Sequence, residues 1–409
     1  MTRQSVGLAM AGGGVSGAIY EIGALKALSD GLDGVDFNAL NVYVGVSAGS
    51  FLASCLANGI SPDQLCRTLV RSEPGEPEFR PEVFHAPAVG QFVKRGLMLP
   101  RLITEGVFDY LENLGMQSFT GAMSRVLRAL PSGLYTNEPL RKYLESIFQR
   151  PGRTNDFRML ERELFIVAAD LDSGEAVVFG DNANSHVPIS RAVQCSTALP
   201  GLYPPVQIDG RYYVDGVLLK TMHASVALQR GAKLLFCINP IVPINTAKAA
   251  EIGVMKRGKL VDRGLIPIIS QSLRTLIHSR LTVGVAAYDT KYDDADVVLF
   301  EPSRDDYKMF FTNVFSFSSR KAICEHAYHA TLKSLRDRRD ILEPVLAEHG
   351  VSYRDHIVNQ PKRDLWHELG VSDRPGSEAT LRLESALREL ERQLDAMKNN
   401  ERSFTGTSV

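Results

Sequence analysis

The sequence predicts an α/β fold, a three-layer sandwich in which helices cover both faces of a mainly parallel central sheet. The first third of the chain alternates short apolar runs with longer segments of helical periodicity, which is typical of a parallel sheet. Glycine-rich stretches follow the first two apolar runs, where such sheets turn from strand to helix. The 409 residues, 44% of them hydrophobic, are enough to bury a large core.

The first strand is expected at Val6–Met10, and a helix is expected to follow it over residues 18–28. This helix has apolar residues at helical spacing and a glycine just after it: Ile19, Ile22, Leu25, Leu28 and Gly31. A second strand at 41–44 and a second helix at 48–58 repeat the pattern. Further along, the sequence predicts a strand pair at 163–169 and 175–180, a hairpin at 206–214, and buried strands at 233–239 and 296–301.

Two regions depart from this alternation. Residues 73–135 hold many prolines and mixed apolar segments, so they are expected to form an insertion or lid on a main domain that spans 1–320. Residues 321–409 are expected to form a helical C-terminal extension, disordered over 399–409. Within 383–397 the apolar residues step 4-3-4-3, at Leu383, Leu387, Leu390, Leu394 and Met397. Such a two-heptad seam predicts either a helix packed on its own body or a homodimer contact.

Bulk properties exclude several classes of protein. The formal net charge of −1 gives no sign of nucleic-acid binding or of attraction to an acidic membrane. No secretory signal is recognisable, and no apolar run approaches the roughly 18 residues of a spanning helix. The five scattered cysteines fit neither a disulfide framework nor a zinc site. A cytoplasmic location is therefore expected.

The strongest local motif is Gly45-Val46-Ser47-Ala48-Gly49, which lies between an expected strand and an expected helix. A sharp turn there would lift the serine hydroxyl clear of the backbone, and the flanking glycines would permit close packing. The helix N-terminus would add its positive dipole end near the hydroxyl. The motif predicts that Ser47 is a nucleophile.

A second motif, Gly12-Gly13-Gly14-Val15-Ser16-Gly17, follows the first strand and has two functional interpretations. It matches the dinucleotide-binding pattern, but that fold requires an acidic residue at the end of the second strand, and Ser47 occupies this place. An esterase would use the glycines for backbone N–H groups that bind a tetrahedral oxyanion. A glycine turn that only allows close packing is the third possibility.

A serine nucleophile needs a base. An α/β-hydrolase triad would use a histidine, and His186 and His223 flank the best carboxylate, although His223 is expected on a helix that starts at Asp215. Asp215 closes the apolar run Tyr212-Tyr213-Val214 at a strand end, where ligand sites of α/β sheets gather. It is the better candidate, and its alternative role is to cap the next helix.

Taken together, these motifs resemble the patatin-like phospholipases. The resemblance covers roughly residues 5–240 and includes the Pro-rich turn at 196–205, which begins Ser196-Thr197-Ala198 and ends Tyr203-Pro204-Pro205, and Asp215-Gly216. In that family a serine and an aspartate form a catalytic dyad without histidine, and no metal or other cofactor is needed. The resemblance implies that Ser47 is the nucleophile and Asp215 the base. It further implies oxyanion-hole donors at Gly12, Gly13 and Gly14, with motif support from Gly17, Gly45, Gly49 and Gly216.

Three departures from the family pattern bear on the substrate rather than on the dyad. Ser16 stands where the glycine loop usually has Arg or Lys. Val217 replaces the usual Gly or Ala after Asp-Gly, and residues 220–223 replace a stretch with Asn and Pro. The head group and acyl chain therefore stay open.

The resemblance implies a lipid or other fatty-acyl ester as substrate. Apolar residues at 89–107 and 307–317 are candidates for an acyl groove or, equally, for ordinary core, and 89–107 is the expected lid that touches a membrane or lipid droplet. Two other functions stay open: an acyltransferase that uses the same acyl-enzyme, and a non-catalytic lipid-binding or scaffolding protein.

Overall fold

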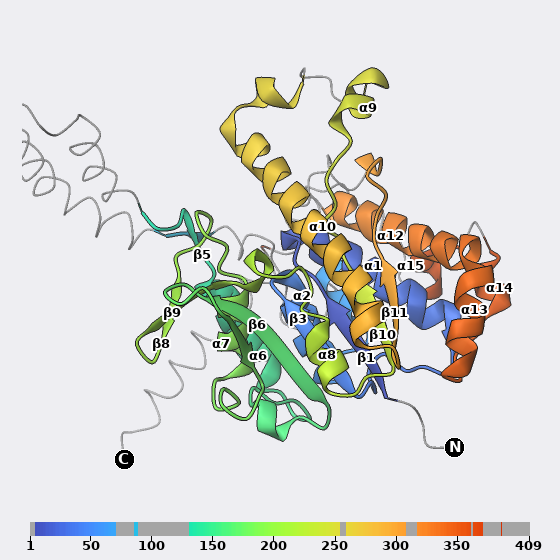
Figure 1. Ribbon diagram of the computed structural model, residues 1–409, viewed down its shortest axis with the longest axis horizontal. Coiled ribbons are helices and arrows are strands. Elements are labelled where there is room, and N and C mark those ends of the chain that lie inside the picture. Colours follow the sequence, from blue (N-terminus) through green and yellow to red (C-terminus); the bar gives the residue numbers. More distant parts are fainter. Residues whose placement is uncertain are drawn as a thin grey trace, which may run out of the picture.

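The computed structural model describes residues 5–70, 86–88, 131–253, 259–307, 317–360, 363–370 and 386. Its centre is an eight-stranded sheet of order β11-β10-β1-β3-β6-β9-β8, with β7 on the other edge of β6 (Figure 1). The strands are β1 (Val6–Met10), β3 (Val42–Val46), β6 (Glu163–Asp170), β7 (Ala176–Phe179), β8 (Val206–Ile208), β9 (Arg211–Asp215), β10 (Leu234–Ile238) and β11 (Asp296–Phe300). From β11 to β6 neighbouring strands are parallel, whereas β7, β9 and β8 pair antiparallel.

Helices cover both faces of this sheet, which confirms the predicted three-layer α/β fold. One face carries α1 (Gly14–Gly31), α2 (Ala48–Ala57), α6 (Glu138–Phe148), α7 (Ile189–Ser196) and α12 (Phe317–Asp337). The other face carries α8 (Ser225–Gln229) and the long α10 (Leu265–Lys291). The other α-helices in the described part of the chain are α3 (Pro62–Leu65), α9 (Thr246–Glu251), α13 (Arg339–Glu348), α14 (Asp355–Val358) and α15 (Leu365–Glu368).

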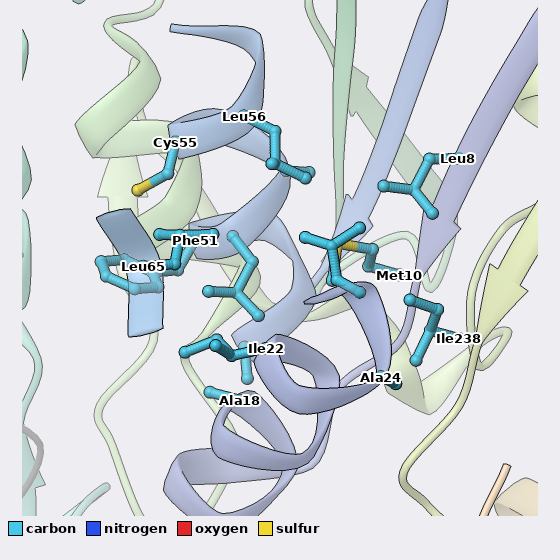
Figure 2. Packing of buried hydrophobic residues seen from close by; sticks show 14 of the residues in the cluster. Leu8, Met10, Ala18, Ile22, Ala24, Phe51, Cys55, Leu56, Leu65 and Ile238 are labelled. Atoms are coloured by element: carbon cyan, nitrogen blue, oxygen red, sulfur yellow. The ribbon is translucent and has the colours of Figure 1, made fainter. Parts of the chain in front are cut away.

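The alternation of side chains along β1 shows why both layers are needed. Leu8 and Met10 point into the core under α1 and α2 (Figure 2). Ala9 belongs to the opposite core, under α8 and α10. Successive side chains of a strand point to opposite faces, so a strand without polar residues must be covered on both sides. The apolar run at Val6–Met10 thus requires the two helical layers.

The helical C-terminal region packs on the first helix of the fold. A Cβ atom at Gly23 of α1 would lie 2.2 Å from the Cys324 carbonyl oxygen of α12 and 2.9 Å from the Ala327 Cβ. The two helices are therefore in backbone contact. A two-stranded sheet of β2 (Leu32–Asp33) and β12 (Ser352–Tyr353) ties the same region to the end of α1.

Some sequence-based expectations require correction or cannot be followed. Asp215 does not start an α-helix: a 3-10 turn at Gly216–Leu218 follows it, and α8 begins only at Ser225. The long helix α10 was not anticipated. Of the expected insertion at 73–135, the structure describes only 86–88 and 131–135, where β4 (Ala86–Pro87) pairs with β5 (Tyr135–Thr136). Three further predictions fall outside the described residues: the lid at 89–107, nearly all of the apolar segment at 307–317, and the seam at 383–397 apart from residue 386.

Gly23→Ala should destabilise the protein by about 2–3 kcal/mol, because the added methyl group overpacks the α1–α12 contact. Gly284→Ala in α10 is the matched control: its Cβ atom meets no heavy atom within 4 Å. Since glycine is unfavourable inside a helix, this second change should stabilise by about 0.5–1 kcal/mol. Urea unfolding measures both. Equal midpoints for the two variants would contradict the close helix contact.

Candidate active site

Ser47 lies on a strained turn between β3 and α2. Its φ of 53° and ψ of −125° place a non-glycine residue in a region that L-residues seldom occupy. Such strain persists only where the surroundings enforce it, and it concentrates at functional sites. The turn lifts the hydroxyl from the end of a buried strand, while the side chain itself is only 8% exposed.

The two glycines of the turn are required by close packing. A Cβ atom at Gly45 would lie 2.4 Å from the Ser50 Cα, and one at Gly49 would lie 2.4 Å from the Ala11 carbonyl oxygen. The Gly49 N–H donates a 2.9 Å hydrogen bond to that same Ala11 oxygen. The Ser47 turn is thus fastened to the end of the neighbouring strand β1, where the glycine loop begins.

The glycine loop runs directly beside Ser47. A Cβ atom at Gly12 would lie 3.0 Å from the Ser47 Cβ and 3.4 Å from its Oγ. Gly13 and Gly14 have φ values of 144° and 62°, and α1 begins at Gly14. The structure therefore places the N-termini of both α1 and α2 near one hydroxyl, with their positive dipole ends toward it.

The turn after β10 supports the loop from behind. Pro240 lies so close to the loop that a Cβ atom at Gly13 or Gly17 would be 2.8 Å or 3.0 Å from its Cγ. The preceding side chain, Asn239, is fully buried and donates a 3.0 Å hydrogen bond to the Glu301 carboxylate. Packing by Pro240 and the hydrogen bond of Asn239 thus fix the glycine loop on one side, whereas a Cβ atom at Gly14 would meet no heavy atom within 4 Å.

Asp215 reaches Ser47 because β6 pairs with two strands along one edge. Val46, the last residue of β3, pairs with Val167, and Asp215, the last residue of β9, pairs with the next residue, Ala168. Strand β7 pairs with both Val167 and Ala168, so it occupies the opposite edge. Strands β3 and β9 therefore run toward each other along β6 and end one residue apart. The ends of the two strands therefore meet there, which brings the Ser47 turn after β3 next to Asp215.

The Asp215 carboxyl is buried and hydrogen-bonded. It is 1% exposed, makes a side-chain hydrogen bond with Ser47, and accepts a 3.0 Å hydrogen bond from the Val217 N–H. Burial raises its pKa from 3.8 to about 7, against the opposing effect of those two hydrogen bonds. A Cβ atom at Gly216 would lie 2.4 Å from the Val167 oxygen, so the following glycine lets the chain pass close to β6.

The two histidines weighed as triad members have other contacts. His223 is buried just before α8, and its Nε2 lies 3.2 Å from the Gly216 carbonyl oxygen. Burial lowers its pKa to about 4, and nearby Lys220 acts in the same direction. His186 is exposed, with its Nε2 3.7 Å from the Asp209 carboxylate. The neutral His223 ring thus supports the backbone next to Asp215.

Sequence reasoning missed two buried groups near the site. Glu21 on α1 is fully buried beside the backbone of Ala11, and burial raises its pKa well above the usual range. Tyr203 is 5% exposed, and burial together with the charges of Tyr135 and Asp215 raises its pKa. An unexpectedly polar residue in a helical apolar stripe was the only available signal for Glu21. Tyr203 lies in the Pro-rich turn that the sequence analysis quoted.

Within the described ranges no three His, Cys, Asp or Glu side chains are grouped so as to hold a metal ion. All five cysteines lie in these ranges, are buried and form no disulfide. Among the described helices, none combines the length and apolar character needed to span a bilayer.

Comparison with protein-family models decides the family. Residues 8–228, more than half of the chain, match the patatin-like phospholipase model. The chain belongs to this family. The matched residues include the glycine loop, the Ser47 turn and Asp215, so all three features described above lie inside the family region.

Individual relatives are distant. An uncharacterised protein, R571, of Acanthamoeba polyphaga mimivirus is 25% identical over 211 residues, which cover 51% of this chain and 57% of the relative. The chain thus spans little more than half the length of this relative. VipD of Legionella pneumophila aligns at 15% identity and a TM-score of 0.36, over 82% of this chain and 67% of VipD. The type III effector ExoU aligns at 14% identity and a TM-score of 0.33, over 100% of this chain and 66% of ExoU.

Asp215→Asn should stabilise the protein at alkaline pH. The raised pKa means that the folded state binds the Asp215 proton more tightly than the unfolded state, so this contribution to stability is complete below about pH 4 and lost as pH rises through about 7. Asparagine has no such dependence. At about 1.4 kcal/mol per pKa unit, its advantage should grow from about 1 kcal/mol at pH 4.5 to about 4 kcal/mol at pH 8. Urea unfolding of both proteins at the two pH values tests this, and a constant difference would contradict it.

Proposed function

We propose that this protein is a serine lipid acyl hydrolase in which Ser47 and Asp215 form a catalytic dyad. The observation that carries the proposal is the hydrogen bond between the Ser47 side chain and a buried carboxyl whose pKa burial raises to about 7. A carboxylate with an ordinary pKa near 3.9 is a weak base at neutral pH, whereas one near 7 is matched to its task. Membership of the patatin-like phospholipase family supports lipid acyl hydrolysis in general.

In the proposed reaction, Asp215 accepts the hydroxyl proton while Ser47 Oγ attacks the ester carbonyl carbon. The tetrahedral intermediate collapses to an acyl-enzyme, and the protonated Asp215 returns the proton to the leaving alcohol. Water then attacks the acyl carbon and gives a proton to Asp215. When the second intermediate collapses, the carboxylic acid leaves and Ser47 regains its proton.

We assign the oxyanion site to the backbone of Gly12, Gly13 and Gly14. Gly12 lies against the Ser47 side chain, and the open space around Gly14 leaves room for substrate. Removal of one oxyanion donor costs other enzymes roughly 10²–10³-fold in turnover. The glycine loop is therefore proposed to contribute as much to the rate as the base.

Ser47→Ala and Asp215→Asn should each lower ester turnover by at least ~10³-fold, as in other enzymes that lose a nucleophile or base. A fluorophosphonate probe should label wild-type protein at Ser47 alone, as read by intact mass and peptide mapping. Ser54→Ala, which removes a fully buried hydroxyl that donates to the Phe51 carbonyl oxygen within α2, is a control for general damage near the site. Near-normal turnover by Asp215→Asn would refute the dyad.

The pH dependence should report the ionisation of Asp215. With a base pKa of about 7, kcat/KM for a non-ionising ester should be level above pH 8 and fall about tenfold per pH unit below 7. The raised pKa predicts a loss of activity under mildly acidic conditions, in which an ordinary aspartate would still be ionised. A profile that breaks near pH 4 would show that another group, or an unperturbed carboxylate, acts as the base.

The substrate class and its delivery belong to the same proposal. We infer a phospholipid or simple fatty-acyl ester, processed in the cytoplasm with transient contact to a membrane or lipid-droplet surface. An acyltransferase would differ by forming new ester when glycerol or lysolipid is added. A lipid-binding or scaffolding protein would fail to react with fluorophosphonate while folded.

The proposed homodimer contact through residues 383–397 is a separate question. Light scattering of the full chain and of a chain truncated before residue 383 tests it.

A further inference from the structure

Ser196 is a buried hydroxyl that bridges two backbone groups at the centre of the site. It is the last residue of α7 and is fully buried. Its Oγ accepts a 2.8 Å hydrogen bond from the Ser47 N–H and donates a 2.6 Å hydrogen bond to the Val167 carbonyl oxygen. Both bonds join segments far apart in the sequence, since 149 residues separate Ser47 from Ser196.

The position of this hydroxyl coincides with the gap between two strands. Along β6, pairing with β3 stops at Val167, and pairing with β9 starts at Ala168. Because the backbone turns away at Ser47, its amide no longer extends the β3–β6 ladder. The Ser196 hydroxyl occupies this interruption and links the Ser47 amide to β6 through Val167.

The segment that carries Ser196 also holds the backbone of Asp215. Two residues later, the Ala198 carbonyl oxygen accepts a 3.1 Å hydrogen bond from the Asp215 N–H. The segment itself is fixed by the Asn137 side chain, which donates to the Gln194 carbonyl oxygen and to the Thr197 hydroxyl at 2.7 Å and 3.0 Å. One short stretch of chain thus contacts the main chain of both Ser47 and Asp215.

We propose that Ser196 is a positioning residue: its hydroxyl holds the strained Ser47 turn on β6 at the place that keeps the Ser47 side chain within hydrogen-bond reach of Asp215. The inference rests on the proposed dyad. The Ser196 hydroxyl bonds two backbone groups, the Ser47 N–H and the Val167 carbonyl oxygen, so it acts through the orientation of Ser47. Small errors of alignment at a nucleophile lower the rate of the chemical step more than they weaken substrate binding.

The first test compares Ser196→Ala with Ser54→Ala. Ser54 is also fully buried, and its Oγ donates a 2.7 Å hydrogen bond to the Phe51 carbonyl oxygen within α2, away from the Ser47 amide. Ser196→Ala should lower kcat for a soluble ester about 10–100-fold, with KM changed less than twofold. The rate of fluorophosphonate labelling should fall by the same factor. Ser54→Ala should leave all three within twofold.

The second test measures amide exchange, which does not depend on activity, and its first part uses the wild-type protein alone. In the wild-type protein the Ser47 amide should exchange with deuterated solvent about as slowly as the Val46 amide of β3, as measured by NMR or by exchange mass spectrometry with residue resolution. Ser196→Ala, where it folds, should raise the Ser47 rate at least tenfold and leave Val46 within threefold. Rapid wild-type exchange at Ser47 would overturn the inference. So would a kcat of Ser196→Ala equal to that of Ser54→Ala.

The two tests separate the inference from the proposed function. If wild-type protein neither turns over esters nor reacts with fluorophosphonate, the proposed function fails, and amide exchange at Ser47 still decides whether Ser196 holds the turn. If wild-type protein is active and Ser196→Ala matches it, the dyad stands and the positioning role falls.

Discussion

The arrangement of the site depends on the pairing of β6 with two strands that meet end to end along one of its edges. Val46 and Asp215 pair with consecutive residues, Val167 and Ala168, so the distance between serine and carboxylate is set by backbone hydrogen bonding. Backbone ladders position side chains more rigidly than loops do. The burial of Asp215, its raised pKa and its bond to Ser47 all follow from its place at the end of β9.

The same constraint explains why glycines and a proline surround Ser47. The strained turn at Ser47 passes the end of β1, which leaves no room for a Cβ atom at Gly49, and it brings Ser50 of α2 so close to Gly45 that a Cβ atom is excluded there too. Pro240, which follows β10, packs against the glycine loop at Gly13 and Gly17. Strain of roughly 1–3 kcal/mol at one residue is maintained by contacts from β1, β6 and α7 together. The stability of the core is thereby used to hold the geometry of the site.

Local patterns in the sequence predicted the elements that depend on neighbouring residues. The apolar run at β1, the turn before α2 and the hairpin at Asp209-Gly210 each have a signature within a few residues. The antiparallel direction of β9 and its register on β6 have none, because strand pairing depends on residues more than 40 positions apart. Ser196 was visible only as one serine in a Pro-rich turn, and α10 was hidden because its solvent face carries Leu276 and Val283. Candidate site residues can therefore be predicted from the sequence, whereas the positions of their side chains relative to one another depend on the fold.

The long separation between Ser47 and the residues around it bears on how the protein is made. A ribosome that adds about 5–20 residues per second needs on the order of ten seconds to proceed from Ser47 to Ser196 and Asp215. Helix α12, which packs on the glycine-loop helix α1, emerges later still. Throughout that interval the nascent chain carries its serine without the carboxylate, the bridging hydroxyl or the last covering helix. An unfinished polypeptide consequently has no assembled site until these later segments have been made.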